Sequence, residues 1–162
     1  MGSGKFWRAI LAKTYFHFSG VSLGVGSVIL RGNYGRILAG YPAVIPPAAY
    51  WKLTVEKIFE SVRQSAFPNA PSRLNSSFMF QTEQEARANR HSFNGNMVVL
   101  YQVELTDPNG AQHLGDMNLA TQSFVLNAPN AASNAQAYWS GVAGGVMEML
   151  ADSDMRIVKT IS

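Results

Sequence analysis

The sequence contains no cysteine among its 162 residues. Disulfide bonds, thiol nucleophiles and thiolate-bound metals are therefore excluded, and the chain gives no indication of its redox compartment. The three histidines, His17, His91 and His113, are too far apart in the sequence to form a local metal-binding motif. We therefore expect no structural metal.

Charged residues are scarce, at 14% of the chain against 47% hydrophobic residues. This composition is typical of a folded chain, and the length suits one domain. The net charge of +3 suits an anionic ligand such as a nucleotide, but no cluster of lysine and arginine indicates a nucleic-acid-binding surface. We assign residues 1–13 to an N-terminal arm or short helix and residues 14–162 to a single domain.

Long apolar runs are absent as well. We therefore expect a cytoplasmic protein with no signal peptide and no membrane partner. The glycine-rich segment 24–32, GVGSVILRG, lacks both the G-x-G-x-x-G pattern of dinucleotide-binding folds and the Lys-Ser/Thr ending of a P-loop. It is expected to form turns around a short strand at 27–30.

The segment 56–86 is the most informative stretch of the chain. Apolar residues at helical spacing from Trp51 to Val62 predict an amphipathic helix, with Glu56 on its outer face. Pro68 and Pro71 prevent its continuation, so a polar loop should lead into a strand at 76–80. Thr82 and Glu85 then match a capping box that opens a second helix.

Strands outnumber helices in these patterns, which favours an α+β fold. The strongest strand is 97–105, followed by a turn at 107–110 whose return strand is uncertain. Segment 127–137 begins as a loop and can end as a short helix. The remaining strands are expected at 14–19, 122–126, 146–150 and 155–161.

Three residues are candidates for chemistry. Glu148 interrupts the apolar strand face that Val146 and Leu150 also occupy, and a carboxylate there is costly unless it is paired, at an edge, or functional. His17 is either a half-buried strand histidine or a ligand-binding group. Arg73 is either a surface ion-pair residue or a clamp for phosphate.

The order of short motifs along residues 14–158 resembles small bacterial proteins that are similar to ADP-ribosyltransferases. The likeness is greatest to an uncharacterised branch of them, and more distant to DNA-modifying toxins and RNA 2′-phosphotransferases. The motifs are YFHF around His17, IFESVR, PSRLNSSFMF running into TEQEA, LYQVEL, and YWSG followed by VMEML.

The resemblance implies a split, mostly antiparallel β core with flanking helices and a cleft for NAD, which is the substrate. It implies a toxin or effector that transfers ADP-ribose to a macromolecule, either protein or nucleic acid. Glu148 and His17 are the implied catalytic residues, with His17 also binding NAD. The other expected NAD-binding residues are Arg31, Ser72, Arg73, Ser76, Ser77 and Trp139, with the arginines near the pyrophosphate.

Two features of the sequence depart from the family pattern. Val146 stands two residues before Glu148, so the Glu-x-Glu arrangement of arginine-modifying members is missing. Asn75-Ser76-Ser77 is the nearest match to a Ser-Thr-Ser triplet. The alternatives are an NAD glycohydrolase, an RNA 2′-phosphotransferase, or a noncatalytic interaction domain with the same fold.

Overall fold

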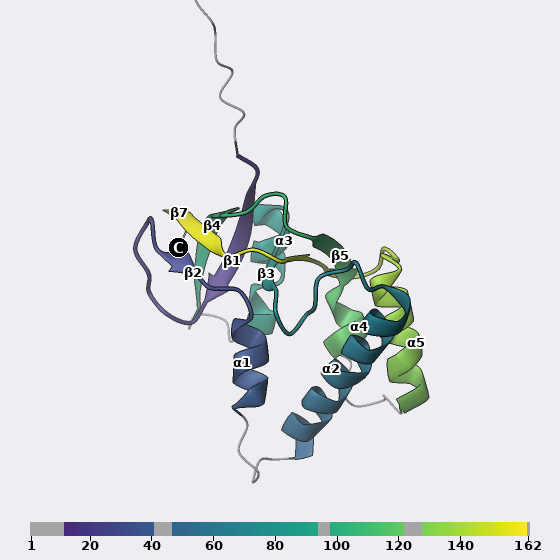
Figure 1. Cartoon of the computed structure of the whole chain (residues 1–162). Helices are drawn as coiled ribbons and strands as arrows, with labels where there is room; N and C mark the ends of the chain where they lie inside the picture. The colour runs from purple at the N-terminus through teal and green to yellow at the C-terminus, as the bar shows by residue number, and fades with distance from the viewer. Residues whose placement is uncertain (1–11, 41–46, 94–97, 122–127, 162) are drawn as a thin grey trace, which may run out of the picture.

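The structure is a computed structural model that describes residues 12–40, 47–93, 98–121 and 128–161 (Figure 1). Its β-strands form two antiparallel sheets, so the α+β class and the antiparallel core expected from the sequence are confirmed. The arm or helix expected before residue 12 and the strand expected at 122–126 lie outside the described residues.

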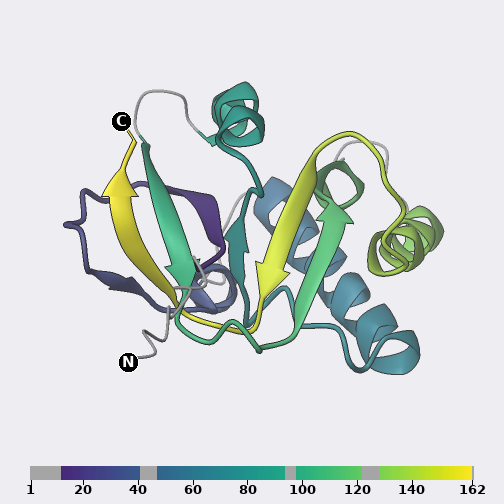
Figure 2. The same ribbon diagram turned by 90° about the horizontal axis from the view of Figure 1, so that it is seen from above.

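The larger sheet has the strand order β1-β4-β7-β2 and the smaller one the order β3-β6-β5. Each sheet draws on both halves of the sequence, and Figure 2 shows the two sheets side by side. The strands are β1 (Thr14–Ser19), β2 (Val28–Ile29), β3 (Ser77–Met79), β4 (Val99–Leu105), β5 (Gln112–Asp116), β6 (Met147–Ala151) and β7 (Met155–Thr160).

Backbone hydrogen bonds join the sheets at one point. The N–H of Phe16 in β1 donates to the carbonyl of Phe80 at 2.9 Å, and the N–H of Phe80, directly after β3, donates back at 2.7 Å. No other backbone hydrogen bond joins β1 to β3 among the described residues, although Nδ1 of His17 lies 2.8 Å from the Phe78 carbonyl. The chain therefore has a divided β core, with β1 and β3 facing each other where it divides.

Two helices cover the smaller sheet. α2 (Pro47–Ala66) and α5 (Ala128–Trp139) pack side by side on that sheet, where Phe59, Tyr138 and Leu150 form a core cluster (Figure 1). The other helices in the described residues are α1 (Asn33–Ala39), α3 (Glu83–Ala88), α4 (Met117–Thr121) and a 3-10 turn at Arg90–Phe93.

Local sequence signals account for several of these elements. The helical spacing from Trp51 to Val62 lies inside α2, and the capping box of Thr82 and Glu85 opens α3 as predicted. The predicted strand at 76–80 is β3 extended by the Phe80 bridge. Local spacing was sufficient here because each signal depends on residues a few positions apart.

Four expectations were wrong or incomplete. Glu56 does not face outward, because it is 3% exposed and bonded to a buried arginine. The turn at 107–110, whose return strand was left uncertain, leads to β5, which lies in the smaller sheet and not beside β4. The helix α1 at 33–39 was not predicted, and residues 128–139 form a longer helix than predicted.

A glycine fixes the position of α1. A Cβ at Gly35 would overlap the backbone carbonyl oxygen of Leu74, so α1 packs directly on the loop that follows Pro71. No larger residue fits there without moving backbone. This close approach holds α1 next to the residues that precede β3.

We predict that Gly35→Ala lowers the free energy of unfolding by about 1–3 kcal/mol, because the overlap outweighs the gain in helix propensity. Urea denaturation followed by circular dichroism measures the change. Gly24→Ala is the matched control, since a Cβ there meets nothing within 4 Å. Equal stability of the two variants would show that α1 does not depend on this approach.

Candidate functional site

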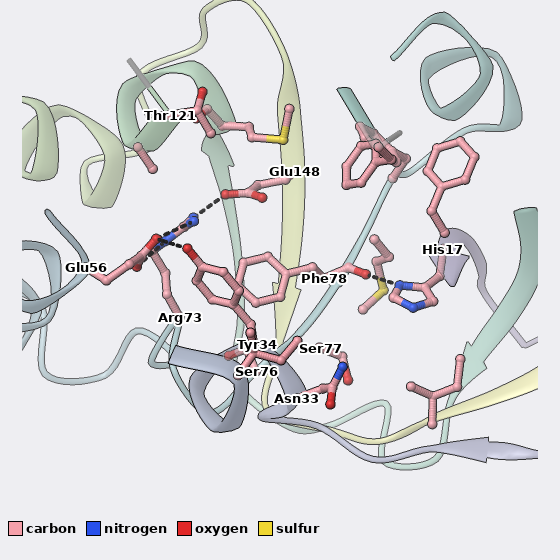
Figure 3. A pocket seen from close by; sticks show the side chains of 18 of the residues that line it. His17, Asn33, Tyr34, Glu56, Arg73, Ser76, Ser77, Phe78, Thr121 and Glu148 are labelled. Atoms are coloured by element: carbon pink, nitrogen blue, oxygen red, sulfur yellow. Dashed lines mark hydrogen bonds and ion pairs between the residues drawn. The ribbon is translucent and has the colours of Figure 1, made fainter. Parts of the chain in front are cut away.

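A cavity of about 540 Å³ is lined by residues of both sheets. Its volume falls within the range of about 300–1,000 Å³ that is common for small-molecule sites. β1, β3 and β6 and helices α1, α2 and α4 contribute to its wall (Figure 3). Most lining residues are apolar, and the polar or charged ones are His17, Asn33, Tyr34, Lys52, Glu56, Arg73, Ser76, Ser77, Thr121 and Glu148.

Arg73 is the buried charge at the centre of one wall. Its Nε donates to Glu56 Oε2 at 3.0 Å, its Nη2 donates to Glu56 Oε1 at 3.1 Å, and its Nη1 contacts Glu148 Oε1 (Figure 3). Nη1 also donates to the Tyr138 hydroxyl at 2.7 Å. The rings of Phe59, Phe78 and Tyr138 surround the guanidinium at 4.9–5.8 Å. Burial opposes the charge, but Glu148 and Glu56 outweigh it and raise the pKa of Arg73.

These contacts change the expected role of Arg73. A guanidinium has five N–H donors, and two carboxylates and a hydroxyl already take most of them. The group is therefore poorly placed to bind a pyrophosphate as well. Arg73 is not the surface ion-pair residue considered from the sequence, because it is buried and holds two carboxylates in place.

Glu148 lies in the middle strand of the smaller sheet and is 6% exposed. Its Oε1 accepts from Arg73 and, at 2.9 Å, from the Tyr138 hydroxyl. Its Oε2 has no hydrogen-bond partner among the described residues, and the side chain lines the cavity. One oxygen is thus anchored while the other is available to a ligand.

Two tyrosines donate hydrogen bonds to the carboxylates: Tyr34 lines the cavity, whereas Tyr138 lies buried behind it. Burial, followed by the nearby charge of Glu56, raises the pKa of Tyr34, and burial raises the pKa of Tyr138. Both hydroxyls therefore stay protonated at neutral pH. Tyr34 donates to Glu56 at 3.0 Å, so a continuous set of contacts runs from α1 through Glu56 and Arg73 to Glu148.

His17 lines the cavity from β1, on the side of Phe78 opposite the arginine (Figure 3). Its Nδ1 lies 2.8 Å from the Phe78 carbonyl, which can only accept, so Nδ1 carries the proton and Nε2 is left as an acceptor. Burial lowers the pKa of His17, although the bond to Phe78 opposes this. The side chain is therefore a neutral imidazole of fixed tautomer at pH 7.

Ser76 and Ser77 also line the cavity, but their hydroxyl protons are already used. Ser76 Oγ donates to the Ser72 carbonyl and Ser77 Oγ to the Ser153 carbonyl, both at 2.7 Å. Toward a ligand, each can offer only oxygen lone pairs. The two serines therefore act mainly in holding the loop before β3.

Three residues expected to bind the cofactor lie outside the cavity lining. Arg31 forms an ion pair with Asp152. Ser72 donates to Glu60 at 2.9 Å. Trp139 is a core residue whose Nε1 donates to the Phe59 carbonyl at 2.9 Å. Each of the three side chains is committed to a contact within the fold.

The sequence reasoning missed Tyr34, Lys52, Glu56 and Tyr138. Glu56 had a weak signal: three helical residues turn about 300°, so it lies only about 60° around α2 from the buried Phe59. A glutamate on the border of an apolar stripe can pair with a buried cation. Tyr34 and Tyr138 carried no such signal, because α1 and the end of α5 were not assigned as helices.

A sequence match to a hydrolase motif has no structural counterpart. Residues 20–24, GVSLG, spell the G-x-S-x-G pattern of a nucleophile elbow, which requires a sharp strand-to-helix turn. Ser22 instead lies exposed on the loop between β1 and β2.

In the described ranges, no group of three or more histidine, aspartate or glutamate side chains is placed to hold a metal ion. Nor is any described helix both long and apolar enough to cross a bilayer.

We predict that Arg73→Met lowers the free energy of unfolding by about 3–5 kcal/mol, because two buried carboxylates lose their counter-charge. Chemical denaturation at pH 7 measures this loss. Arg87→Met removes an exposed i,i+4 pair with Glu83 and should change the free energy of unfolding by no more than about 1 kcal/mol. A small effect at Arg73 would mean that the carboxylates are not buried as described.

We also predict that the protein loses stability as the pH falls below about 6.5, the ordinary pKa of histidine. Burial lowers the pKa of both His17 and His113, so the unfolded chain binds more protons than the folded one in this range. His17→Gln should reduce the slope of unfolding free energy against pH between about 6.5 and 5. A slope that is the same in His17→Gln and in the wild-type protein would contradict this account.

Comparison with known proteins identifies a family. No curated protein matches the chain significantly. The sequence profile of a protein family of unknown function, DUF2441, matches residues 35–162. The matched region includes all the cavity residues except those of β1 and β2, Leu30, Asn33 and Tyr34. The matched region carries Arg73, Glu56 and Glu148. The chain belongs to the DUF2441 family.

Proposed function

We propose that the protein is an ADP-ribosyltransferase that cleaves the bond between nicotinamide and ribose in NAD. The observation that carries this proposal is the state of Glu148: a buried carboxylate with one oxygen anchored and the other available, in the same cavity as a neutral histidine. The resemblance of the chain to ADP-ribosyltransferases supports the same reaction.

The chemistry explains why such a carboxylate is useful. As the bond breaks, its electron pair goes to the nicotinamide nitrogen, and the ribose carbon becomes positively charged until the acceptor attacks it. Glu148 Oε2 would accept a hydrogen bond from a ribose hydroxyl and would stabilise that charge. Arg73, Glu56 and Glu148 together carry one positive and two negative charges, so the wall favours a cation.

The charges of the cavity also match the two ends of NAD. Glu148 lies buried, while Lys52 is exposed on α2 at the cavity wall, near the Tyr34 ring. NAD carries a positive charge on its nicotinamide ring and negative charges on its phosphates. An orientation with the ring toward Glu148 and the phosphates toward Lys52 satisfies both.

His17 would hold the ribose from the other side. Its Nε2 accepts and cannot donate at neutral pH, so a sugar hydroxyl is a suitable partner. In this arrangement His17 orients NAD and Glu148 stabilises the developing charge. The acceptor is a macromolecule, protein or nucleic acid, which labelling can identify.

A noncatalytic binding domain is the second candidate, because Arg73 partly neutralises Glu148. Incubating the purified protein with NAD separates the candidates. Release of nicotinamide with label transferred to a macromolecule supports the transferase, and release without transfer indicates an NAD glycohydrolase. Absence of both turnover and NAD-dependent thermal stabilisation would leave the noncatalytic domain.

We predict that Glu148→Gln lowers the rate of nicotinamide release about 100- to 1,000-fold, equivalent to about 3–4 kcal/mol of transition-state stabilisation. Glutamine keeps an oxygen for Arg73 but lacks the negative charge. Glu83→Gln, on the exposed side of α3, is the control and should retain the wild-type rate. Full activity of Glu148→Gln in a folded protein would refute the role given to Glu148.

A further inference from the structure

Glu56 and Glu148 compete for the same guanidinium. Glu56 takes the edge formed by Nε and Nη2, with contacts of 3.0 and 3.1 Å, and leaves only Nη1 to Glu148. Paired carboxylates and guanidinium groups prefer two parallel bonds. Without Glu56, the preferred arrangement for Arg73 is therefore to bind both oxygens of Glu148.

The surroundings of Arg73 are compatible with such a rearrangement. The three aromatic rings contact the guanidinium without hydrogen-bonding its N–H groups, except for the Tyr138 hydroxyl. Glu56 is thus the group that fixes which edge of the guanidinium faces Glu148. Tyr34 in turn donates to Glu56 Oε1 and helps to hold it.

We propose that Glu56 is a positioning residue that keeps Glu148 Oε2 available to the ligand by retaining Arg73. This inference rests on the proposed function for its consequence in catalysis, but its geometric part stands alone. Glu56 would not contact the reacting atoms through this role. It would act through Arg73, from α2, on a carboxylate in β6.

Glu56→Gln tests the inference, because glutamine has nearly the same shape but no charge to retain Arg73. The first readout is the crystal structure of the variant, in which we expect Arg73 to bind both oxygens of Glu148. The second is turnover of NAD, in which we expect kcat to fall about 10- to 100-fold, the size of effect known for residues that orient the ligands of a metal. KM should change little, because Glu148 acts mainly in the transition state.

Glu60→Gln is a closely matched control. Glu60 lies one turn further along α2 and accepts two bonds from Arg63, at 2.8 and 3.0 Å, but does not line the cavity. It should leave the position of Arg73 and kcat unchanged even if stability falls. Glu56→Asp, which restores the charge, should recover part of the lost kcat.

The outcomes separate this inference from the proposed function. If Arg73 stays in place in Glu56→Gln, the inference is overturned whatever the activity. If Arg73 moves to both oxygens of Glu148 while the wild-type protein neither binds nor consumes NAD, the positioning role is supported and the proposed function fails. An unchanged kcat after that movement would overturn the role of Oε2 in catalysis.

Discussion

The buried guanidinium of Arg73 is the group on which the candidate site depends. It lies in a loop before β3, yet its partners come from α2, from β6 and from the end of α5. These elements are far apart in the sequence, so their contacts with one side chain fix their relative positions. The position of this wall of the cavity therefore depends on the contacts of Arg73 with three elements.

Such an arrangement is a poor way to gain stability alone. Removing charges from water is expensive, and apolar residues of similar volume often stabilise a core as well or better. Here the excess of carboxylate lies at a cavity, where one oxygen of Glu148 has no described partner. Placement beside a cavity favours a role in ligand binding over one in stability.

The sequence predicted the features that depend on neighbouring residues. It did not predict the features that depend on contacts between residues far apart in the chain. The capping box of Thr82 and the helix around Phe59 needed only local spacing. Glu148 was recognised because a charge within an apolar run is conspicuous. Glu56 was assigned to solvent because helical periodicity ranks positions by their angle, whereas its burial is set by an arginine 17 residues away.

The cavity residues show the same division. Placing His17, Ser76, Ser77 and Glu148 around one cavity required the pairing of β1 with β4 and of β3 with β6, which no single segment specifies. Arg31 and Trp139 show the converse case. Their residue types suit a phosphate and a ring, but Asp152 and the Phe59 carbonyl already occupy their polar groups.

Positive and negative charges are separated within the cavity. Lys52 lies exposed, whereas Glu148 and Glu56 lie buried with a single arginine between them. A ligand that is cationic at one end and anionic at the other would gain at both ends, while a simple anion would meet the buried carboxylates. Because the tyrosines and His17 stay neutral at pH 7, this polarity does not depend on their ionisation. The proposed substrate, NAD, has the required polarity, which links the geometry of Arg73 to the choice of reaction.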